Sequence, residues 1–271
     1  MNRSLLYVPG DRPDRVAKAC LSEADGVIVD LEDAVKPAAK QLARATLRDL
    51  ASVTRRADIA IWVRINSGDE GREDLRSMVG MDGIGGLVLA KCESPAWVQE
   101  VAAATPSTWM LSPLIESALA VRDIDAIVAG PRVAACHLGE VDLLADLRGA
   151  PPAGMKLIDA ARIRVIVASA AAKIEPPIGG VHLQIDDLEA LRASSDELAQ
   201  LGFGGRAIVH PSHCAIVNTS FSPSAADREW ASRLLVGYDA ASDGAVRGED
   251  GAMIDEAVVR RARRIMSQRW F

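Results

Sequence analysis

The chain has 271 residues, a hydrophobic fraction of 49%, only 4% aromatic residues and a formal net charge of −6 at pH 7. This length suits one large domain with a mainly aliphatic core, and a β/α barrel typically needs about 250 residues. The mildly acidic balance argues against a nucleic-acid-binding protein, which would need a basic surface to displace counterions.

Apolar runs of strand length alternate with helix-like patterns along the chain. Eight strands are predicted, at Ser4–Val8, Gly26–Leu31, Ala60–Ile65, Gly86–Ala90, Trp109–Ile115, Val133–Leu138, Gly180–Ile185 and Gly205–Val209. Helices are predicted between them at Pro13–Leu21, Pro37–Leu50, Arg72–Val79, Pro95–Ala104, Glu116–Val128, Lys156–Ala172 and Asp187–Leu201. Eight such units predict an α/β fold, a closed TIM-type (β/α)8 barrel, because eight strands enclose an interior that side chains just fill.

An open, doubly wound sheet is the competing architecture. Its phosphate-binding signature is not found, because the glycine clusters Gly83–Gly86 and Gly202–Gly205 lack the required spacing and do not open helices after strands. The closed barrel is therefore the favoured fold.

The C-terminal residues depart from the repeating pattern. A helix is predicted from Phe221 to about Tyr238, a mobile loop rich in Gly, Asp and Ser from Ala240 to Gly251, and a basic helix from Ile254 to Met266. We therefore expect residues 1–220 to form a catalytic barrel domain. Residues 221–271 are expected to form C-terminal helices and a mobile loop that act as a lid or subunit arm.

The cellular setting follows from cysteine usage and hydropathy. Four cysteines are widely separated and form no CxxC pair, so a disulfide framework is not expected. No apolar run reaches the roughly 18 residues of a membrane span, and the first residues show no signal-peptide pattern. These features predict a cytoplasmic protein that does not cross a membrane.

Polar side chains follow several predicted strands at the point where each strand ends. In a parallel barrel these ends share one face, with neighbouring strands about 4.8 Å apart. Glu116 and Asp142 follow consecutive strands, so their carboxylates can converge. Two carboxylates with open water positions suit Mg²⁺. The alternative is that each acid simply caps a helix.

Arg64 closes an apolar strand, where its burial requires an anionic partner. Its fork can bind a substrate carboxylate or form a salt bridge to Asp30 or Glu32, and the two roles are compatible. Asp30, Glu32 and Asp33 crowd one strand end and need a cation or a metal nearby. Lys91 is a candidate for that cation, and a solvent-facing loop lysine is its alternative reading.

The first strand is followed by a basic turn and helix, which carry Arg12, Arg15 and Lys18. Their charges could hold the phosphates of a cofactor arm. A solvated helix face explains the same spacing equally well.

Short motifs distributed along nearly the whole chain, and kept in order, are similar to a known family. They are Arg3-Ser-Leu-Leu-Tyr-Val-Pro-Gly10, Asp30-Leu-Glu-Asp-Ala-Val35, Val63-Arg-Ile-Asn66, Leu114-Ile-Glu-Ser117, Gly139-Glu-Val-Asp-Leu143, Gly202-Phe-Gly-Gly-Arg206, His210-Pro211 and Gly251-Ala-Met-Ile-Asp255. With these motifs the chain resembles the citrate lyase β-subunit-like proteins of the HpcH/HpaI aldolase superfamily.

This resemblance implies a β/α barrel, Mg²⁺, a coenzyme A thioester and usually a homotrimer. It implies that Glu116 and Asp142 bind the metal and that Arg64 contacts the carboxylate or carbonyl of the substrate. It also implies that Asp255 reaches a neighbouring subunit's site and transfers a proton. The turn with Arg12, Arg15 and Lys18 would lie near the thioester arm.

The chain departs from the family pattern at two positions. Val141 stands where an acidic residue often precedes Asp142, and Glu140 is displaced from that position by one residue. Ala257 stands where a proline is common after the Asp255 motif. The first departure bears on the metal shell or the substrate preference, and the second on how the arm is held.

These observations predict a Mg²⁺-dependent carbon–carbon lyase. Its substrate would be a carboxylated 3-hydroxyacyl-CoA, such as citramalyl-, malyl- or hydroxymethylglutaryl-CoA, cleaved to an acyl-CoA and a 2-keto acid (a 3-keto acid in the case of hydroxymethylglutaryl-CoA). One alternative is a citrate lyase β subunit that acts on an acyl-carrier-protein thioester within a larger complex. Another is a non-catalytic CoA-binding interaction protein, against which the joint presence of Arg64, Glu116, Asp142 and Asp255 argues.

Overall fold

The structure is a computed structural model that describes residues 2–54, 59–239, 246–247 and 253–267. The chain divides into two compact units, Met1–Phe221 and Ser222–Phe271. No described helix is both long enough and apolar enough to cross a membrane.

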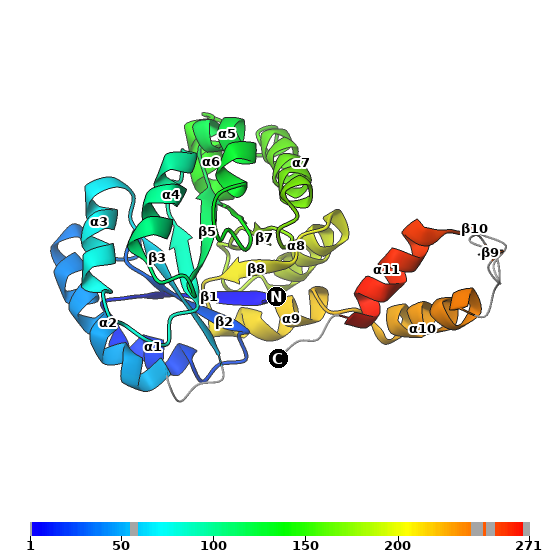
Figure 1. Cartoon of the computed structure of the whole chain (residues 1–271), viewed down its shortest axis with the longest axis horizontal. Helices are drawn as coiled ribbons and strands as arrows, with labels where there is room; N and C mark the ends of the chain where they lie inside the picture. Colours follow the sequence, from blue (N-terminus) through cyan, green and yellow to red (C-terminus); the bar gives the residue numbers. More distant parts are fainter. Residues whose placement is uncertain (1, 55–58, 240–245, 248–252, 268–271) are drawn as a thin grey trace. The chain divides into compact units, whose positions relative to one another are not determined.

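Eight parallel strands close the first unit into a barrel, in the order β1 to β8 (Figure 1). They are β1 (Ser4–Pro9), β2 (Gly26–Asp30), β3 (Ala60–Ile65), β4 (Gly86–Leu89), β5 (Met110–Ile115), β6 (His137–Leu138), β7 (Ile178–Gly179) and β8 (Gly205–Ile208). Parallel pairing of β1 with both β2 and β8 closes the ring. The predicted TIM-type barrel is confirmed.

Helices surround the strands (Figure 1). They are α1 (Pro13–Ala19), α2 (Lys40–Thr54), α3 (Gly68–Ser77), α4 (Pro95–Ala104), α5 (Ala118–Val128), α6 (Glu140–Asp146), α7 (Met155–Ala172), α8 (Leu188–Leu201) and α9 (Cys214–Ser220), with short 3₁₀ turns η1 (Pro37–Ala39) and η2 (Pro211–His213). Sequence signals fix several ends: Ser94 caps α4 ahead of Pro95, and Gly202 ends α8 with φ 112°.

Two apolar clusters hold the barrel together. The larger lies between the strands and the helices and includes Val29, Ile65, Leu89 and Ile124. The smaller fills the barrel interior with one residue from each of six strands, namely Leu5, Ile28, Val88, Leu114, Ile178 and Ala207. Inward and outward side chains alternate along each strand, so the inward-pointing residues of several strands meet inside the barrel. There they form an apolar layer below the carboxyl ends of the strands.

The structure corrects two strand predictions. The seventh strand is Ile178–Gly179, not Gly180–Ile185, and it pairs with His137 and Gly205. Apolar residues in the predicted segment are exposed, such as Leu183, so their alternation belongs to a loop. The sixth strand is only His137–Leu138, since Val133 forms just an isolated bridge with Leu111.

Helix boundaries also shift around the strand ends. Ser117 caps α5 by accepting a hydrogen bond from the Ala120 backbone, so Glu116 lies before the helix instead of in its first turn. The short helix α6 follows β6 and was missed, because its start at Gly139 carries no side-chain cap signal. The third helix begins at Gly68, four residues earlier than predicted.

The second unit contains two helices and a small sheet. It comprises α10 (Ala225–Asp239), β9 (Val246–Arg247), β10 (Met253–Ile254) and α11 (Glu256–Ser267). The helices pack through Ala231, Leu234, Val259 and Ala262, and β9 pairs antiparallel with β10. Residues 246–247 of the predicted loop are therefore a strand, and residues 240–245 and 248–251 lie outside the described residues.

Candidate functional site

Two cavities meet at the carboxyl ends of the strands. The smaller has a volume of about 80 Å³ and is lined by polar groups that include Tyr7, Arg64 and His137. The larger has a volume of about 670 Å³ and is lined by residues such as Arg72, Trp97, Lys91 and Asp146. Both cavities share Glu116 and Asp142. The structure therefore brings three predicted site residues, Arg64, Glu116 and Asp142, to one place.

Arg64 enters the site from β3 and is fixed by acids from the end of β2. Its Nε and Nη2 atoms donate to the two carboxylate oxygens of Asp30 at 2.7 and 2.6 Å. Its Nη1 atom lies 3.2 Å from Glu32 Oε2, and its guanidinium lies 4.8 Å from the centre of the Tyr7 ring. Burial lowers the pKa of Arg64, but hydrogen bonding and charge attraction from Asp30 outweigh it and raise the pKa overall.

Arg64 therefore forms the predicted salt bridges to Asp30 and Glu32. These contacts do not use all of its N–H donors. A guanidinium has five N–H donors. Three of them are directed at Asp30 and Glu32. The remaining two are not taken up by other described residues, so they are available to a carboxylate in the cavity.

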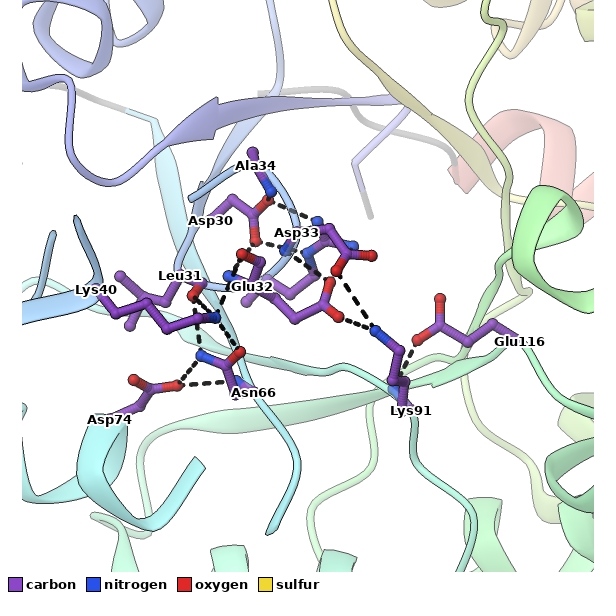
Figure 2. A network of polar contacts seen from close by, with 11 residues as sticks. Asp30, Leu31, Glu32, Asp33, Ala34, Lys40, Asn66, Asp74, Lys91 and Glu116 are labelled. Atoms are coloured by element: carbon purple, nitrogen blue, oxygen red, sulfur yellow. Dashed lines mark hydrogen bonds and ion pairs between the residues drawn. The ribbon is translucent and has the colours of Figure 1, made fainter. Parts of the chain in front are cut away.

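The carboxylate of Asp30 has all its hydrogen-bond positions filled, and it influences the site by holding Arg64. Besides the two bonds from Arg64, its oxygens accept hydrogen bonds from the backbone of Glu32 and Ala34 at 2.9 and 3.0 Å (Figure 2). The carboxylate is fully buried. With four donors on two oxygens, Asp30 has little capacity for a ligand, and its role is to orient Arg64.

Lys91 connects the acidic run of β2 with Glu116 (Figure 2). Its ammonium group pairs with Glu32 and lies 3.5 Å from Asp33, so it supplies the cation that these acids require. Its backbone N–H donates to Glu116 Oε1 at 2.6 Å. Lys91 holds a left-handed backbone conformation, φ 48°, which is uncommon for a residue with a side chain.

A second polar network, formed by Lys40, Asn66 and Asp74, holds the backbone just after β2 (Figure 2). The Lys40 ammonium donates to Asn66 Oδ1 at 2.5 Å and to the Leu31 carbonyl at 3.0 Å. Asn66 donates to the same carbonyl at 2.9 Å and to Asp74 at 2.7 Å. These contacts hold the backbone that carries Glu32, and sequence reasoning did not find them.

Glu116 is a buried carboxylate at the end of β5. Burial and the negative charge of Asp142 raise its pKa to about 7, against the lowering effect of the Lys91 backbone bond. Its Oε2 atom receives no hydrogen bond from a described residue. Gly139 makes room for it, because a Cβ there would lie 2.6 Å from Glu116 Cβ and 2.9 Å from Oε2.

Asp142 lies in the first turn of α6, exposed at the rim of both cavities. The displaced acid Glu140 does not take the place of the acid that Val141 lacks. Its two oxygens accept hydrogen bonds from Arg162 of α7 at 2.8 and 3.0 Å. Val141 itself lines the smaller cavity with an apolar side chain.

The donor chemistry of this site fits Mg²⁺. Glu116 and Asp142 repel each other across the cavity edge, so a cation between them would relieve the repulsion. Within the described ranges, no group of three or more His, Cys, Asp or Glu side chains is arranged to hold a metal. Two carboxylates with remaining positions left to water or ligand oxygens are the pattern that Mg²⁺ accepts.

Two other sets of predicted residues lie outside these cavities. Arg12, Arg15 and Lys18 are exposed on α1 and the turn before it, and Arg12 hydrogen-bonds Asp14 at 3.1 Å. Asp255 belongs to the second unit, where it is exposed and caps α11 by accepting from the Ala257 backbone at 2.9 Å. Their proposed contacts to coenzyme A and to a neighbouring site stay predictions.

The sequence reading missed Tyr7 and His137, which both line the smaller cavity. Each lies within an apolar strand, whereas the predicted site residues close a strand or follow one. An isolated polar residue at an inward position of a strand, above the interior apolar layer, is the signal that would have found them.

Comparison with known proteins identifies the family of the chain. The HpcH/HpaI aldolase/citrate lyase family model matches residues 3–211. A citrate lyase subunit beta-like protein of Deinococcus radiodurans is 32% identical, over 98% of this chain and 96% of that protein. A (3S)-malyl-CoA thioesterase of Cereibacter sphaeroides (strain ATCC 17025 / ATH 2.4.3) is also 32% identical, over 95% and 89% of the two chains.

The fold comparison gives the same result. The crystal structure of CitE from Mycobacterium tuberculosis in complex with magnesium, acetoacetate and coenzyme A superposes with a TM-score of 0.84. Its sequence is 31% identical, and the match covers 97% of this chain and 96% of that one. The motifs of the sequence and the geometry of the barrel therefore agree, and the chain belongs to the HpcH/HpaI aldolase/citrate lyase family.

Proposed function

We propose that the protein is a Mg²⁺-dependent carbon–carbon lyase for a carboxylated 3-hydroxyacyl-CoA. One observation carries the proposal: an arginine with two available donors and a pair of mutually repelling carboxylates face the same small cavity. A carboxylate anchor beside a cation site is the arrangement that a 2-hydroxy or 2-keto acid requires.

Each residue has a defined role in this proposal. Arg64, oriented by Asp30 and Glu32, binds the substrate carboxylate. Glu116 and Asp142 hold Mg²⁺, which when bound supplies a Lewis acid for the hydroxyl or keto oxygen of the substrate. The CitE complexes with magnesium and acetoacetate, and with magnesium and pyruvate, support this assignment by relationship.

Cleavage breaks the bond between the hydroxyl-bearing carbon and the carbon next to the thioester carbonyl. The hydroxyl oxygen gives up its proton and becomes the keto oxygen, while the bonding electron pair moves into the thioester enolate. Protonation of that enolate carbon gives the acyl-CoA. We assign the proton transfer to Asp255 of a neighbouring subunit in a homotrimer, and the condensation uses the same groups in reverse.

The coenzyme A arm is assigned to Arg12, Arg15 and Lys18. Their exposure on α1 leaves the charges accessible to phosphates. Because α1 follows β1, its first turn emerges at the carboxyl end of the barrel, the same face as the two cavities.

Thioester hydrolysis is the second candidate function. It is favoured by the 32% identical (3S)-malyl-CoA thioesterase of Cereibacter sphaeroides. Both reactions need the same carboxylate anchor, but they differ in their products. A lyase retains the thioester in an acyl-CoA and releases a keto acid, whereas a thioesterase releases free coenzyme A and a hydroxy diacid.

The test follows both products from citramalyl-, malyl- and hydroxymethylglutaryl-CoA, with Mg²⁺ and with EDTA. The proposal expects a keto acid, without free thiol, from at least one substrate and only with Mg²⁺. Free thiol without keto acid identifies the thioesterase instead. Neither product from any of the three substrates would reject both reactions for this substrate class.

A further inference from the structure

His137 is a buried polar side chain whose Nδ1 atom has no hydrogen-bond partner in the part of the chain that the structure describes. It lies on β6 between Leu114 of β5 and Ile178 of β7, and it is only 3% exposed. Its Nδ1 atom is sealed from solvent and has no hydrogen-bond partner among the described residues. An unsatisfied buried polar atom is unfavourable, so a ligand that contacts the ring is favoured if a small ring rotation uncovers Nδ1 and gives it a hydrogen bond.

The position of the ring shows where that partner would come from. His137 lines the small cavity together with Arg64, Glu116 and Asp142. Much of the remaining lining is apolar or glycine, for example Val181. The cavity volume is only about 80 Å³, against about 670 Å³ for the adjoining cavity. The cavity therefore suits a short acid and excludes the coenzyme.

The imidazole can bond such an acid without adding charge. Burial, with a contribution from the Arg64 guanidinium, lowers the pKa of His137 to about 3. A neutral imidazole has one N–H donor and one lone-pair acceptor. It can therefore donate to a carboxylate or carbonyl oxygen, or accept from a hydroxyl, beside the cation site.

We propose that His137 is a specificity-determining residue, whose ring hydrogen-bonds an oxygen of the short 2-oxo or 2-hydroxy acid that Arg64 anchors. The assignment rests on the proposed function, because it takes the acid part of the substrate to occupy this cavity. Arg64 selects for a carboxylate, and His137 selects for a second polar group within a compact acid. An acid with a bulky apolar substituent leaves the ring unsatisfied and is rejected.

Binding of pyruvate and ring NMR test this role in the full chain. The protein has four histidines, so ring ¹⁵N resonances are few, and the one absent in His137→Leu belongs to His137. Pyruvate added with Mg²⁺ should shift that resonance in the wild-type protein. His137→Leu should lower pyruvate affinity about tenfold in calorimetry, with Mg²⁺ affinity unchanged in the absence of pyruvate.

Two variants complete the design. His137→Gln returns a polar amide to the cavity and should recover part of the pyruvate affinity. His213→Leu is the matched control, because His213 is also buried, its Nδ1 has no hydrogen-bond partner among the residues described, and it lines neither cavity. It should bind pyruvate as the wild type does.

The outcomes separate this role from the proposed function. Wild-type affinity in His137→Leu, or an unshifted His137 resonance while pyruvate is bound, would overturn the assignment of His137 and leave the lyase standing. Failure of the wild-type protein to bind pyruvate, glyoxylate or acetoacetate with Mg²⁺ would overturn the proposed function, and the role of His137 with it. If His137→Leu does not fold, the resonance absent in His137→Gln identifies His137, and its shift in the wild-type protein on pyruvate binding decides.

Discussion

The two sides of the barrel mouth differ in how their polar groups are satisfied. On the side of β2 to β4, Asp30 and Glu32 are paired with Arg64 and Lys91, and most of their oxygens accept several bonds. A second set of contacts around Asn66 fixes the backbone behind them. This side can keep its shape without a ligand.

On the side of β5 and β6, in contrast, the polar groups have few partners. Among the described residues, Glu116 receives one backbone hydrogen bond and is repelled by Asp142, and His137 has a buried ring nitrogen without a hydrogen-bond partner. A buried polar group that is not satisfied costs free energy, so this side is completed by what binds there. The paired side orients Arg64, and the incomplete side marks where metal and acid belong.

The largest expected effect tests whether the incomplete side is completed by a second subunit. Asp255→Asn should lower turnover about 10² to 10⁴-fold, the usual contribution of a general acid or base. Mg²⁺ binding and assembly should be retained, since Asp255 is an exposed helix cap in the second unit. Steady-state kinetics and calorimetry measure the two properties.

A mixing experiment sharpens this prediction. Asp255→Asn subunits combined with Arg64→Ala subunits should regain part of the activity, because a mixed form of the proposed homotrimer would contain some sites with both residues intact. Subunit exchange that is confirmed by mass spectrometry but restores no activity contradicts the shared site. Full turnover in Asp255→Asn alone removes this residue from the mechanism.

Arg64→Ala should remove the ion pairs with Asp30 and Glu32 that hold the paired side together. Removing one partner of a buried ion pair costs about 3–5 kcal/mol of stability, because the buried Asp30 carboxylate loses its counter-charge. The same change should lower kcat/KM by roughly two or more powers of ten through loss of the carboxylate anchor. Urea unfolding and kinetics give the two quantities.

A second substitution separates stability from function at this pair. Arg64→Ala combined with Asp30→Asn should recover part of the stability, because no uncompensated charge remains. It should not recover activity. Recovery of kcat/KM in the double variant would show that Arg64 acts only as a structural partner of Asp30.

On the incomplete side, a substitution is expected to increase the stability of the metal-free protein instead of lowering it. Glu116→Gln should abolish Mg²⁺ binding in calorimetry but stabilise the metal-free protein at pH 8. The folded state raises the pKa of Glu116 from 4.5 to about 7, so the wild type loses stability as the pH rises through this window. The Gln variant has no such loss, and its advantage in EDTA should therefore grow between pH 4.5 and 8.

Asp142→Asn is the matched variant, as it removes the other carboxylate from the exposed rim. It should also lose Mg²⁺ affinity, but with little gain in stability, because an exposed charge costs little to keep. Unchanged Mg²⁺ binding in both variants rules out these two residues as metal ligands.

The smallest effect is expected away from both sides of the mouth. Replacing Arg12, Arg15 and Lys18 together by alanine should raise KM for a CoA substrate about tenfold with little change in kcat, because contacts remote from the reacting bond act through binding. Exposed charges of this kind contribute little to folding. If the triple variant binds coenzyme A normally, the three residues form only a solvated helix face.

The sequence located the barrel and the polar strand ends because both follow from local patterns. Arg64, Glu116 and Asp142 each follow or close a predicted strand, and the parallel order of the strands brings them together. Lys91 was found by the same rule. Strand-end position is thus a strong guide to which residues share the mouth.

What the sequence did not predict depends on short elements and distant contacts. A two-residue strand such as β7 leaves no periodic pattern, so an apolar loop was taken in its place. Asn66 contacts Lys40 and the Leu31 carbonyl, which are 26 and 35 residues away along the chain. The missing partner of His137 is likewise visible only when its neighbours from β5 and β7 are in place.

The cysteines of the barrel have a practical consequence for spectroscopy. All four are buried free thiols, and burial raises the pKa of each, to about 12 for Cys92 and about 11 for Cys136 and Cys214. The thiolate is the form that attacks maleimide, so the native chain should be almost inert to maleimide dyes at neutral pH. A single Arg260→Cys substitution on the exposed face of α11 would then label selectively. Its fluorescence could follow the C-terminal unit as substrate binds, without removal of any native cysteine.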